Sequence, residues 1–508
     1  MGSLTRDLLL ATPFLVLLYV QLVHHVMWRD ELNGLAIAWA SPTIPSLFWH
    51  IHHEGHPWLW YMILWIPSRF TQSVLVLKFV QGIVSTAVIL WVALRSPFRA
   101  WEKALVLASY FFVFEYTVLA RMYGVMLLLL VLYLWRRTAR SGKPIGSAVL
   151  LGLMASTDTL GIILSAALIA EYAYAAWASR RESPLFNRAI AVRALLVYGL
   201  ITAFAIWSAK PAKDISWRTT GRPLEHAKSL GHLYDAFLRY TILPFIPVQS
   251  PRSQFFWNPG LHYNRLAYTL LMLIMVAMLY FAFRKRTSLL LLMAVAIAGG
   301  TALEHLVYPG SERHFGLVFL AFVAGAWILR ASEPGQPLAW TIYVLLGISA
   351  LSSVRAVIGS WKHPFSNDKR AAEWIMANHL ERMPFVAEQD TSAVGVAEYL
   401  HRPVYMIECS CADTYLLFSS RRDNFTDADA PSRILEAEHF YHDQPLLFMR
   451  VRPITPFEQG RLQSEGFEIE PLASFTGAEE IYENFYFYRL TLTAPNRNSQ
   501  PAQQPPAS

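Results

Sequence analysis

Residues 28–31 read Trp-Arg-Asp-Glu and residues 50–57 read His-Ile-His-His-Glu-Gly-His-Pro, and both follow an apolar segment at 8–27. At 1.5 Å of rise per residue, this segment is long enough to cross a bilayer as a helix. Asp30 and Glu31 are therefore expected at a membrane surface, where a hydrophobic helix ends. A carboxylate there is neither fully solvated nor fully buried, so its pKa can be tuned and it can meet a lipid-borne substrate. The simpler alternative is that these charges are a polar stop for the first helix.

The composition of the whole chain indicates a multi-pass membrane protein. Of 508 residues, 54% are hydrophobic and only 16% are charged, whereas soluble domains have about 25% charged residues. The net charge is +7, but Lys and Arg stand in short clusters between apolar runs. This is the positive-inside pattern of membrane proteins rather than a nucleic-acid footprint, so we expect no nucleic-acid partner. Arg6 precedes the first apolar segment without a small-residue cleavage signal, which favours an uncleaved anchor.

Four basic loops, at 95–103, 136–143, 180–188 and 284–286, set the expected topology. All four lie on the cytoplasmic side if the chain alternates through about eleven spans from a cytoplasmic N-terminus. The expected spans are at about 8–27, 74–95, 103–119, 122–135, 146–157, 160–178, 190–208, 264–283, 287–306, 314–330 and 338–357. In this topology the Trp-rich segment 57–69 is an interfacial helix and not a span.

The same alternation places two long loops on the outer face. The first, 28–73, is broken by Pro42 and Pro45, so we expect short helices lying along the membrane. The second, 209–263, has an excess of positive charge that suits an anionic partner such as a phosphate or a lipid headgroup. Its cations are Lys210, Lys213, Arg218, Arg222 and Lys228.

The pattern changes after residue 357, where helices alternate with strands. We expect the transmembrane domain to cover 1–357, a small outer α/β domain to cover 358–493, and a disordered tail at 494–508 that is rich in Pro, Gln, Asn and Ser. Helices are predicted at 369–380, 394–400 and 456–465, and strands at 384–388, 402–407, 445–451, 468–473 and 484–493. Cys409 and Cys411 are one residue apart and poorly placed for a mutual disulfide, so none is expected.

Four short motifs, in order along the membrane part, resemble a known family. The acidic pair at 30–31 and the Glu-Gly-His-Pro at 54–57, followed by Leu-Trp-Tyr, resemble the "DE … HPPLYY" layout of bacterial GT-C glycosyltransferases. Residues 120–124, Ala-Arg-Met-Tyr-Gly, look like the "ARMYA" segment of that superfamily, and 308–314 look like its "YPGSxRH" segment. The resembling group includes the protein O-mannosyltransferase-like enzymes and the lipid A aminoarabinose transferase. Trp58 stands where the family usually has a second proline.

The resemblance implies a polytopic all-α membrane bundle of GT-C type, with interfacial helices in the first outer loop and an active site at the outer face of a bacterial plasma membrane. It implies a sugar donor carried on a polyprenyl monophosphate and an inverting transfer to a lipid, glycan or protein acceptor. Asp30 matches the position of the family's catalytic base, and the adjacent Glu31 is the alternative. A carboxylate that takes the acceptor's proton contributes about 10²–10⁴-fold to the rate.

The leaving group in such a reaction is a lipid phosphate, whose developing charge needs fixed cations. Arg presents a planar fork that suits phosphate oxygens, and Arg313 and then Arg121 are the candidates, with His314 beside Arg313. The expected substrate-binding side chains, which would hydrogen-bond sugar hydroxyls or phosphate, are His53, Glu54, His56, Tyr123 and Tyr308. A snorkelling arginine at the membrane interface is the structural alternative for both arginines.

A divalent metal such as Mg or Mn is a further alternative, with His52, Glu54 and His56 as its ligands, because some GT-C enzymes hold the leaving phosphate with a cation. The spacing of these side chains matches no closed zinc template. Other functions stay open: a lipid or glycolipid transporter or flippase, a non-catalytic envelope-assembly protein, or an enzyme that uses a pyrophosphate donor.

Overall fold

The computed structural model describes residues 3–139, 144–179, 188–216, 229–247, 257, 264–308, 310–442 and 444–493. The chain forms two compact units, 1–365 and 366–508. The boundary expected after residue 357 falls inside the last long helix of the first unit, α16 (Trp340–Lys362). The basic loop at 180–188 lies almost wholly outside the described residues, and so do Arg218, Arg222, Lys228 and the tail at 494–508.

The first unit is a helical membrane bundle. In its described part, eight helices are long and apolar enough to cross a membrane. They are α1 (Ser3–His24), α5 (Leu75–Arg95), α9 (Thr159–Ser179), α10 (Arg188–Ser208), α13 (Arg265–Phe283), α14 (Thr287–Leu306), α15 (Glu312–Ser332) and α16. The prediction of about eleven spans is therefore wrong.

The three other predicted spans are helical but short or broken. In place of one span at 103–119 there are α6 (Ala100–Ala108) and the π-helix η1 (Phe111–Glu115), because Ser109 adopts an extended conformation between them. The other two are α7 (Met122–Thr138) and α8 (Pro144–Ala155). A 12-residue helix such as α8 rises about 18 Å, which is less than the roughly 30 Å of a hydrocarbon core. Hydropathy alone does not reveal such interruptions.

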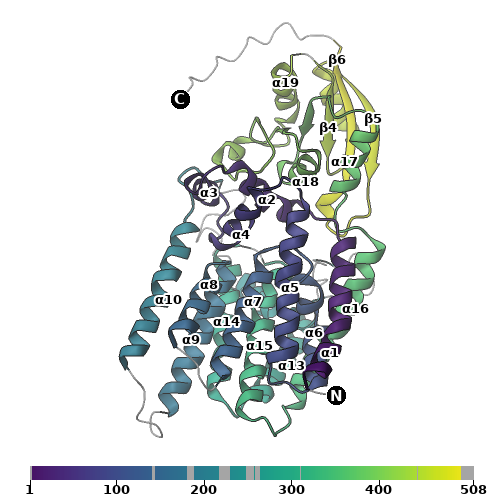
Figure 1. Cartoon of the computed structure of the whole chain (residues 1–508). Helices are drawn as coiled ribbons and strands as arrows, with labels where there is room; N and C mark the ends of the chain where they lie inside the picture. Colours follow the sequence, from purple (N-terminus) through teal and green to yellow (C-terminus); the bar gives the residue numbers. More distant parts are fainter. Residues whose placement is uncertain are drawn as a thin grey trace. The chain divides into compact units, whose positions relative to one another are not determined.

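The segment 28–73 forms three short helices, as expected: α2 (Arg29–Ala40), α3 (Ile44–Ile51) and α4 (Leu59–Ser68). They gather at one end of the bundle (Figure 1), where α2 packs against α4 and α4 against α5. The α3 helix begins after Thr43, whose hydroxyl accepts the Ser46 amide. The second long loop contains a helix that the sequence analysis missed, α12 (Leu230–Ile242), which packs against α14. In the same loop, Lys210 and Lys213 are exposed.

The central helix of the bundle is α15, in which 83% of the residues of an apolar 18-residue stretch are buried. It contacts α7, α9, α12 and α14. A side chain at Gly316 would collide with the ring of Tyr116, so this glycine lets the segment before α7 approach α15 closely. This packing brings the N-terminal ends of α7 and α15 to the same end of the bundle as α2 (Figure 1).

The second unit is a small α/β domain around a six-stranded sheet of order β3-β2-β1-β4-β6-β5. Its strands are β1 (Phe385–Ala387), β2 (Val404–Met406), β3 (Cys411–Asp413), β4 (Leu446–Arg450), β5 (Phe467–Phe475) and β6 (Phe485–Leu492), and its helices are α17 (Asp368–Ala377), α18 (Asp390–Leu400), α19 (Ala430–Phe440) and α20 (Pro456–Ser464). The strand β1 runs parallel to β2 and β4, and the other pairs are antiparallel. A separate apolar core covers each face of the sheet. The strand β3 and the helix α19 were not predicted from the sequence.

Cys409 and Cys411 form a disulfide, which corrects the expectation of none. Their Cα atoms are 5.2 Å apart, within the usual range for such a bond. Ser410 between them adopts a left-handed conformation with a φ of 47°. This turn, which the sequence spacing does not reveal, brings the two side chains together.

Candidate active site

The Asp30 carboxylate binds two arginines that come from distant parts of the chain. Its Oδ2 lies 3.1 Å from Arg121 Nη1 and 2.9 Å from Arg313 Nη1. Arg121 also donates to the backbone carbonyl of Asp30 at 2.7 Å. Arg121 is the N-cap of α7, and Arg313 is in the first turn of α15. The side chains of the two arginines are only 9% and 12% exposed, whereas that of Asp30 is 24% exposed.

The charge of this cluster fixes the protonation state of Asp30. Burial alone would raise the pKa of the Asp30 carboxyl, but the positive charges of Arg313, Arg121 and Arg29 outweigh it and hold the pKa well below its usual value. Asp30 is therefore ionised throughout the physiological range. With three cations around one carboxylate, the cluster has a net positive charge and suits a second anion.

Glu31, the alternative base, is fully buried and occupied by structural contacts. Its Oε2 lies 2.8 Å from His25 Nε2 and accepts the Trp28 amide at 3.1 Å. Its Oε1 accepts the amide of Ala120. Glu31 thus caps α2 and ties it to α1 and to the segment before Arg121. Of the two carboxylates, Asp30 is therefore the one that binds Arg121 and Arg313.

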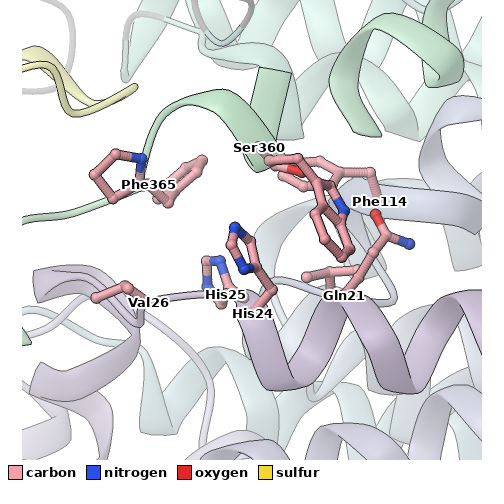
Figure 2. A pocket seen from close by; sticks show the side chains of 10 residues that line it. Gln21, His24, His25, Val26, Phe114, Ser360 and Phe365 are labelled. Atoms are coloured by element: carbon pink, nitrogen blue, oxygen red, sulfur yellow. The ribbon is translucent and has the colours of Figure 1, made fainter. Parts of the chain in front are cut away.

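A small cavity lies beside the His25 ring that holds Glu31. Figure 2 shows the side chains of His24, His25, Phe114 and Ser360 around it. Its volume is about 10 Å³, which is room for about one water molecule. The cavity therefore has no room for a sugar.

Two tryptophans hold the Arg313 guanidinium from its other side. Its Cζ lies 5.5 Å from the Trp28 ring and 6.0 Å from the Trp257 ring. The two indoles pack edge to face at 5.2 Å, and Trp257 donates to Glu115 Oε2 at 3.1 Å. Such cation–π contacts fix the direction of the guanidinium as well as its position. Arg313 therefore points at Asp30 because an aromatic cage orients it.

Glu54 interacts electrostatically with Asp30 and with Arg121. It accepts Asn33 Nδ2 at 3.0 Å and the Tyr61 hydroxyl at 3.2 Å. Burial raises the pKa of the Glu54 carboxyl and the charge of Asp30 adds to this, and the opposing effects of His56, Tyr61 and Arg121 do not cancel the rise. Glu54 thus differs from Asp30, because its surroundings raise the pKa of its carboxyl whereas those of Asp30 lower it.

His56 and His314 both interact electrostatically with Asp158. His56 Nδ1 lies 3.0 Å from Asp158 Oδ2. Burial alone would raise the pKa of Asp158, but the His56 contact, the Leu160 amide and His314 outweigh it and lower the pKa. The His314 ring meets the rings of Tyr123 and Tyr308 edge to face, at 6.4 and 5.5 Å. His314 Nδ1 accepts the Ser311 amide at 2.9 Å, which directs Nε2 away from the helix end.

The predicted candidates His52 and His53 instead bind the segment that follows α10. His52 Nδ1 lies 2.7 Å from the Lys210 carbonyl, and His53 Nε2 lies 3.0 Å from Asp214 Oδ1. The alternative metal ligands His52, Glu54 and His56 thus each contact a different partner. In the described ranges no group of three or more His, Cys, Asp or Glu side chains is arranged to hold a metal ion.

Several residues of the cluster were not candidates in the sequence analysis. They are Trp28 and Trp257 beside Arg313, and Asn33 and Tyr61 on Glu54. Trp28 and Asn33 flank the acidic pair closely enough for their position to have suggested a role. Trp257 lies in the long loop 209–263, and nothing in its local sequence connects it to Arg313.

No family model matches the chain, and comparisons with curated proteins and with solved structures give no significant match.

Proposed function

We propose that this protein is a membrane glycosyltransferase that moves a sugar from a polyprenyl-monophosphate donor to a lipid, glycan or protein acceptor, with inversion and with Asp30 as the general base. The observation that carries the proposal is the shared contact of Arg121 and Arg313 with Asp30 Oδ2. It brings a carboxylate and two phosphate-binding side chains to one place at the end of a membrane bundle.

The surroundings of Asp30 suit a phosphate as well as a carboxylate. Arg121 precedes the first turn of α7 and Arg313 lies in the first turn of α15. The N-terminus of a helix carries a partial positive charge and free amide groups, which favour an anion. Two helix N-termini and two arginines therefore act in the same direction. A departing lipid phosphate at this place is stabilised as its negative charge develops.

The phosphate and Asp30 compete for the same guanidinium groups, and this competition supplies the base. In the free protein the arginines keep the pKa of Asp30 well below its usual value, so the carboxylate is a weak base. A donor phosphate that binds Arg121 and Arg313 draws their charge away from Asp30 and raises its proton affinity. The carboxylate becomes a better base only when the donor is in place.

The neighbouring polar groups supply sugar-binding contacts in this proposal. Glu54, His56, Tyr123 and His314 lie around the same cluster, and an exposed Tyr308 stands beside His314. We place the reaction at the outer face of a bacterial plasma membrane, with a cytoplasmic N-terminus and an extracytoplasmic C-terminal domain. His52 and His53 have no part in the reaction in this proposal, because they bind the segment after α10. A divalent metal is not needed, since the arginines supply the positive charge.

The test is a transfer assay in proteoliposomes with a panel of radiolabelled polyprenyl-phosphate hexoses and pentoses and a bacterial envelope extract as the acceptor source. We expect release of polyprenyl phosphate by the native protein and a loss of at least about 10²-fold in Asp30→Asn. Asp214→Asn is the matched control, because Asp214 is 62% exposed and lies on His53. Full activity in Asp30→Asn, or movement of the labelled lipid across the bilayer without sugar transfer, would refute the proposal.

A further inference from the structure

A second cavity lies at the opposite end of the bundle from Asp30. It has a volume of about 260 Å³ and is formed by the α13–α14 connection, at 281–286, and by the α15–α16 connection, at 333–341. The helix α15 runs from Arg313 at the Asp30 end to Ser332 at this end. Its 21 residues rise about 30 Å, so the cavity is a site separate from the Asp30 cluster.

Cations predominate on one wall of this cavity. Arg284, Lys285 and Arg286 are consecutive and exposed, and among the described residues of the lining Glu333 is the one carboxylate. Glu333 Oε1 is engaged by Arg286 Nη2 at 3.0 Å. Across the part of the chain that the structure describes, Arg284 and Lys285 have no ion-pair partner. Within the described residues, the cavity therefore has two positive charges that no carboxylate neutralises.

A second wall of the cavity offers hydrogen-bond donors. It is the N-terminal turn of α16, whose first residues Trp340 and Thr341 line the cavity. The first amides of a helix have no intrahelical acceptor and favour an anion. The Thr341 side chain is 1% exposed, and its Oγ1 has no hydrogen-bond partner in the described ranges. A buried hydroxyl without a partner costs free energy unless a ligand binds it.

This second wall is held in place by a buried network. Arg330 is fully buried, pairs with Glu102 and donates to the Gln336 carbonyl. The Tyr343 hydroxyl donates to Glu102 at 2.8 Å and accepts the Leu338 amide at 3.1 Å. Residues 336–338 are thereby fixed before any ligand binds. A preformed site loses less free energy in ordering itself when it binds a ligand.

The aromatic residues at the edge of the cavity indicate the depth at which it lies. Trp340 is 67% exposed and Phe281 is 48% exposed, and both belong to membrane-spanning helices. The Arg284 guanidinium lies 5.3 Å from the Phe281 ring. Exposed Trp residues and arginines that lie over apolar rings are typical of the headgroup level of a bilayer. A ligand at this place would have its polar part in the cavity and its apolar part beside the helices.

We propose that this basic cavity, lined by Arg284, Lys285, Thr341 and the first turn of α16, binds the phosphate of an anionic phospholipid headgroup. The cations and the α16 amides bind the phosphate oxygens, and the Thr341 hydroxyl donates to one of them. The acyl chains lie against Phe281 and Trp340. This site is independent of sugar transfer, and it would link the ends of α13, α14 and α16 through one lipid.

The proposal is tested with the full chain, purified and delipidated, by titrating phosphatidylglycerol and phosphatidylcholine and counting bound lipids by native mass spectrometry. We expect a first phosphatidylglycerol that binds at least tenfold more tightly than phosphatidylcholine. Arg284→Gln with Lys285→Gln should weaken it by about 25-fold, since each surface cation contributes about fivefold. Thr341→Val, which changes no charge, should weaken it by about tenfold.

Two control variants separate the cavity from general surface charge. Arg6→Gln with Arg95→Gln removes two exposed cations, and Ser332→Ala removes a hydroxyl that already binds the Ile328 carbonyl. None of these three side chains lines the cavity, so the first lipid should bind within about twofold of the native affinity. Equal weakening in the charge control, or unchanged binding in both cavity variants, overturns the proposal. Binding of soluble glycerol phosphate as tight as that of the lipid would also overturn it, because the occupant would then be a free anion.

Discussion

Arg313 Nη1 lies 2.9 Å from Asp30 Oδ2, so the second residue of α15 and the second residue of α2 share an ion pair. The N-terminus of α2 favours the carboxylate of Asp30, whereas the N-terminus of α15 disfavours the cation of Arg313. The anion that faces Arg313 offsets this unfavourable interaction with the helix N-terminus. In the free protein that anion is Asp30, and in the proposed reaction a donor phosphate takes its place.

Removal of the Asp30 charge should strengthen phosphate binding while it abolishes transfer. In Asp30→Asn the guanidinium groups of Arg121 and Arg313 no longer have a competing carboxylate, so a phosphate binds them more tightly. We expect about a tenfold lower Kd for a short-chain polyprenyl phosphate, corresponding to about 1.4 kcal/mol, measured by isothermal titration calorimetry. Asp214→Asn should leave the Kd unchanged. Weaker binding in Asp30→Asn would contradict the competition.

Substitution of Glu31 should lower the stability of the protein and leave its phosphate affinity almost unchanged. Glu31→Gln disturbs a buried network with His25, Trp28 and Ala120, and we expect a loss of about 1–3 kcal/mol of stability. Thermal unfolding in detergent measures this loss as a lower Tm. The phosphate affinity of the protein that remains folded should stay within about twofold, since Glu31 does not contact the arginines. An unchanged Tm together with lost phosphate binding would assign Glu31 to the site instead.

The aromatic cage predicts a graded effect at Trp257. Trp257→Phe retains a ring near Arg313 and loses only the indole donor to Glu115, whereas Trp257→Ala removes the cation–π contact as well. Such a contact contributes about 0.5–1 kcal/mol at accessible sites and more where it is desolvated, and Trp257 is buried. We therefore expect phosphate binding at least about 5-fold weaker in Trp257→Ala than in Trp257→Phe. The cage has no such role if the two variants bind phosphate equally.

The C-terminal domain should lose stability as the pH rises. Burial, aided by the charge of Asp413, raises the pKa of Glu398 to about 8 against the opposing Thr414 hydrogen bond. A carboxyl whose folded-state pKa exceeds its unfolded value of about 4.3 stabilises the fold below that value and loses this contribution up to about pH 8. The slope approaches about 1.4 kcal/mol per pH unit between those limits.

Hydrogen exchange of the α18 amides in the full chain measures this slope at several pH values, after correction for the intrinsic exchange rate. In Glu398→Gln the group does not titrate, so the opening free energy should be nearly constant with pH. The same dependence in both proteins would show that another group is responsible. Glu458 is a useful internal contrast, because its hydrogen bonds with Arg450 lower its pKa to about 2 and its contribution is lost only in acid.

Local sequence patterns predicted most of the secondary structure. The apolar segment at 8–27 gave α1, and Pro42 separates α2 from α3, whose first turn contains Pro45. The strand patterns of the second unit lie within two residues of β1, β2, β4, β5 and β6. These features depend on hydropathy period and on proline, which act within a few residues. The number of spans could not be predicted from these local features, because Ser109 interrupts one predicted span and α8 is too short to cross a bilayer unaided.

The Asp30 cluster could be predicted only in part. Asp30, Arg121 and Arg313 were candidates, because each lies at the end of an apolar run beside a motif that resembles GT-C enzymes. Their contact with one carboxylate oxygen, and the separation of His52 and His53 from them, required the packing of α2, α7 and α15. The tryptophan cage and the buried role of Glu31 were equally beyond the reach of local pattern.

The sequence by itself determined that this chain is a helical membrane protein with an appended α/β domain and with charges at the ends of its apolar segments. Hydrophobicity and charge are properties of single residues and short windows, so they can be read without a fold. Only the tertiary structure decided which of those charges meet. An ion pair between α2 and α15 depends on the direction of each helix and on the rotamer of each side chain, and these are set by contacts between residues far apart in the chain.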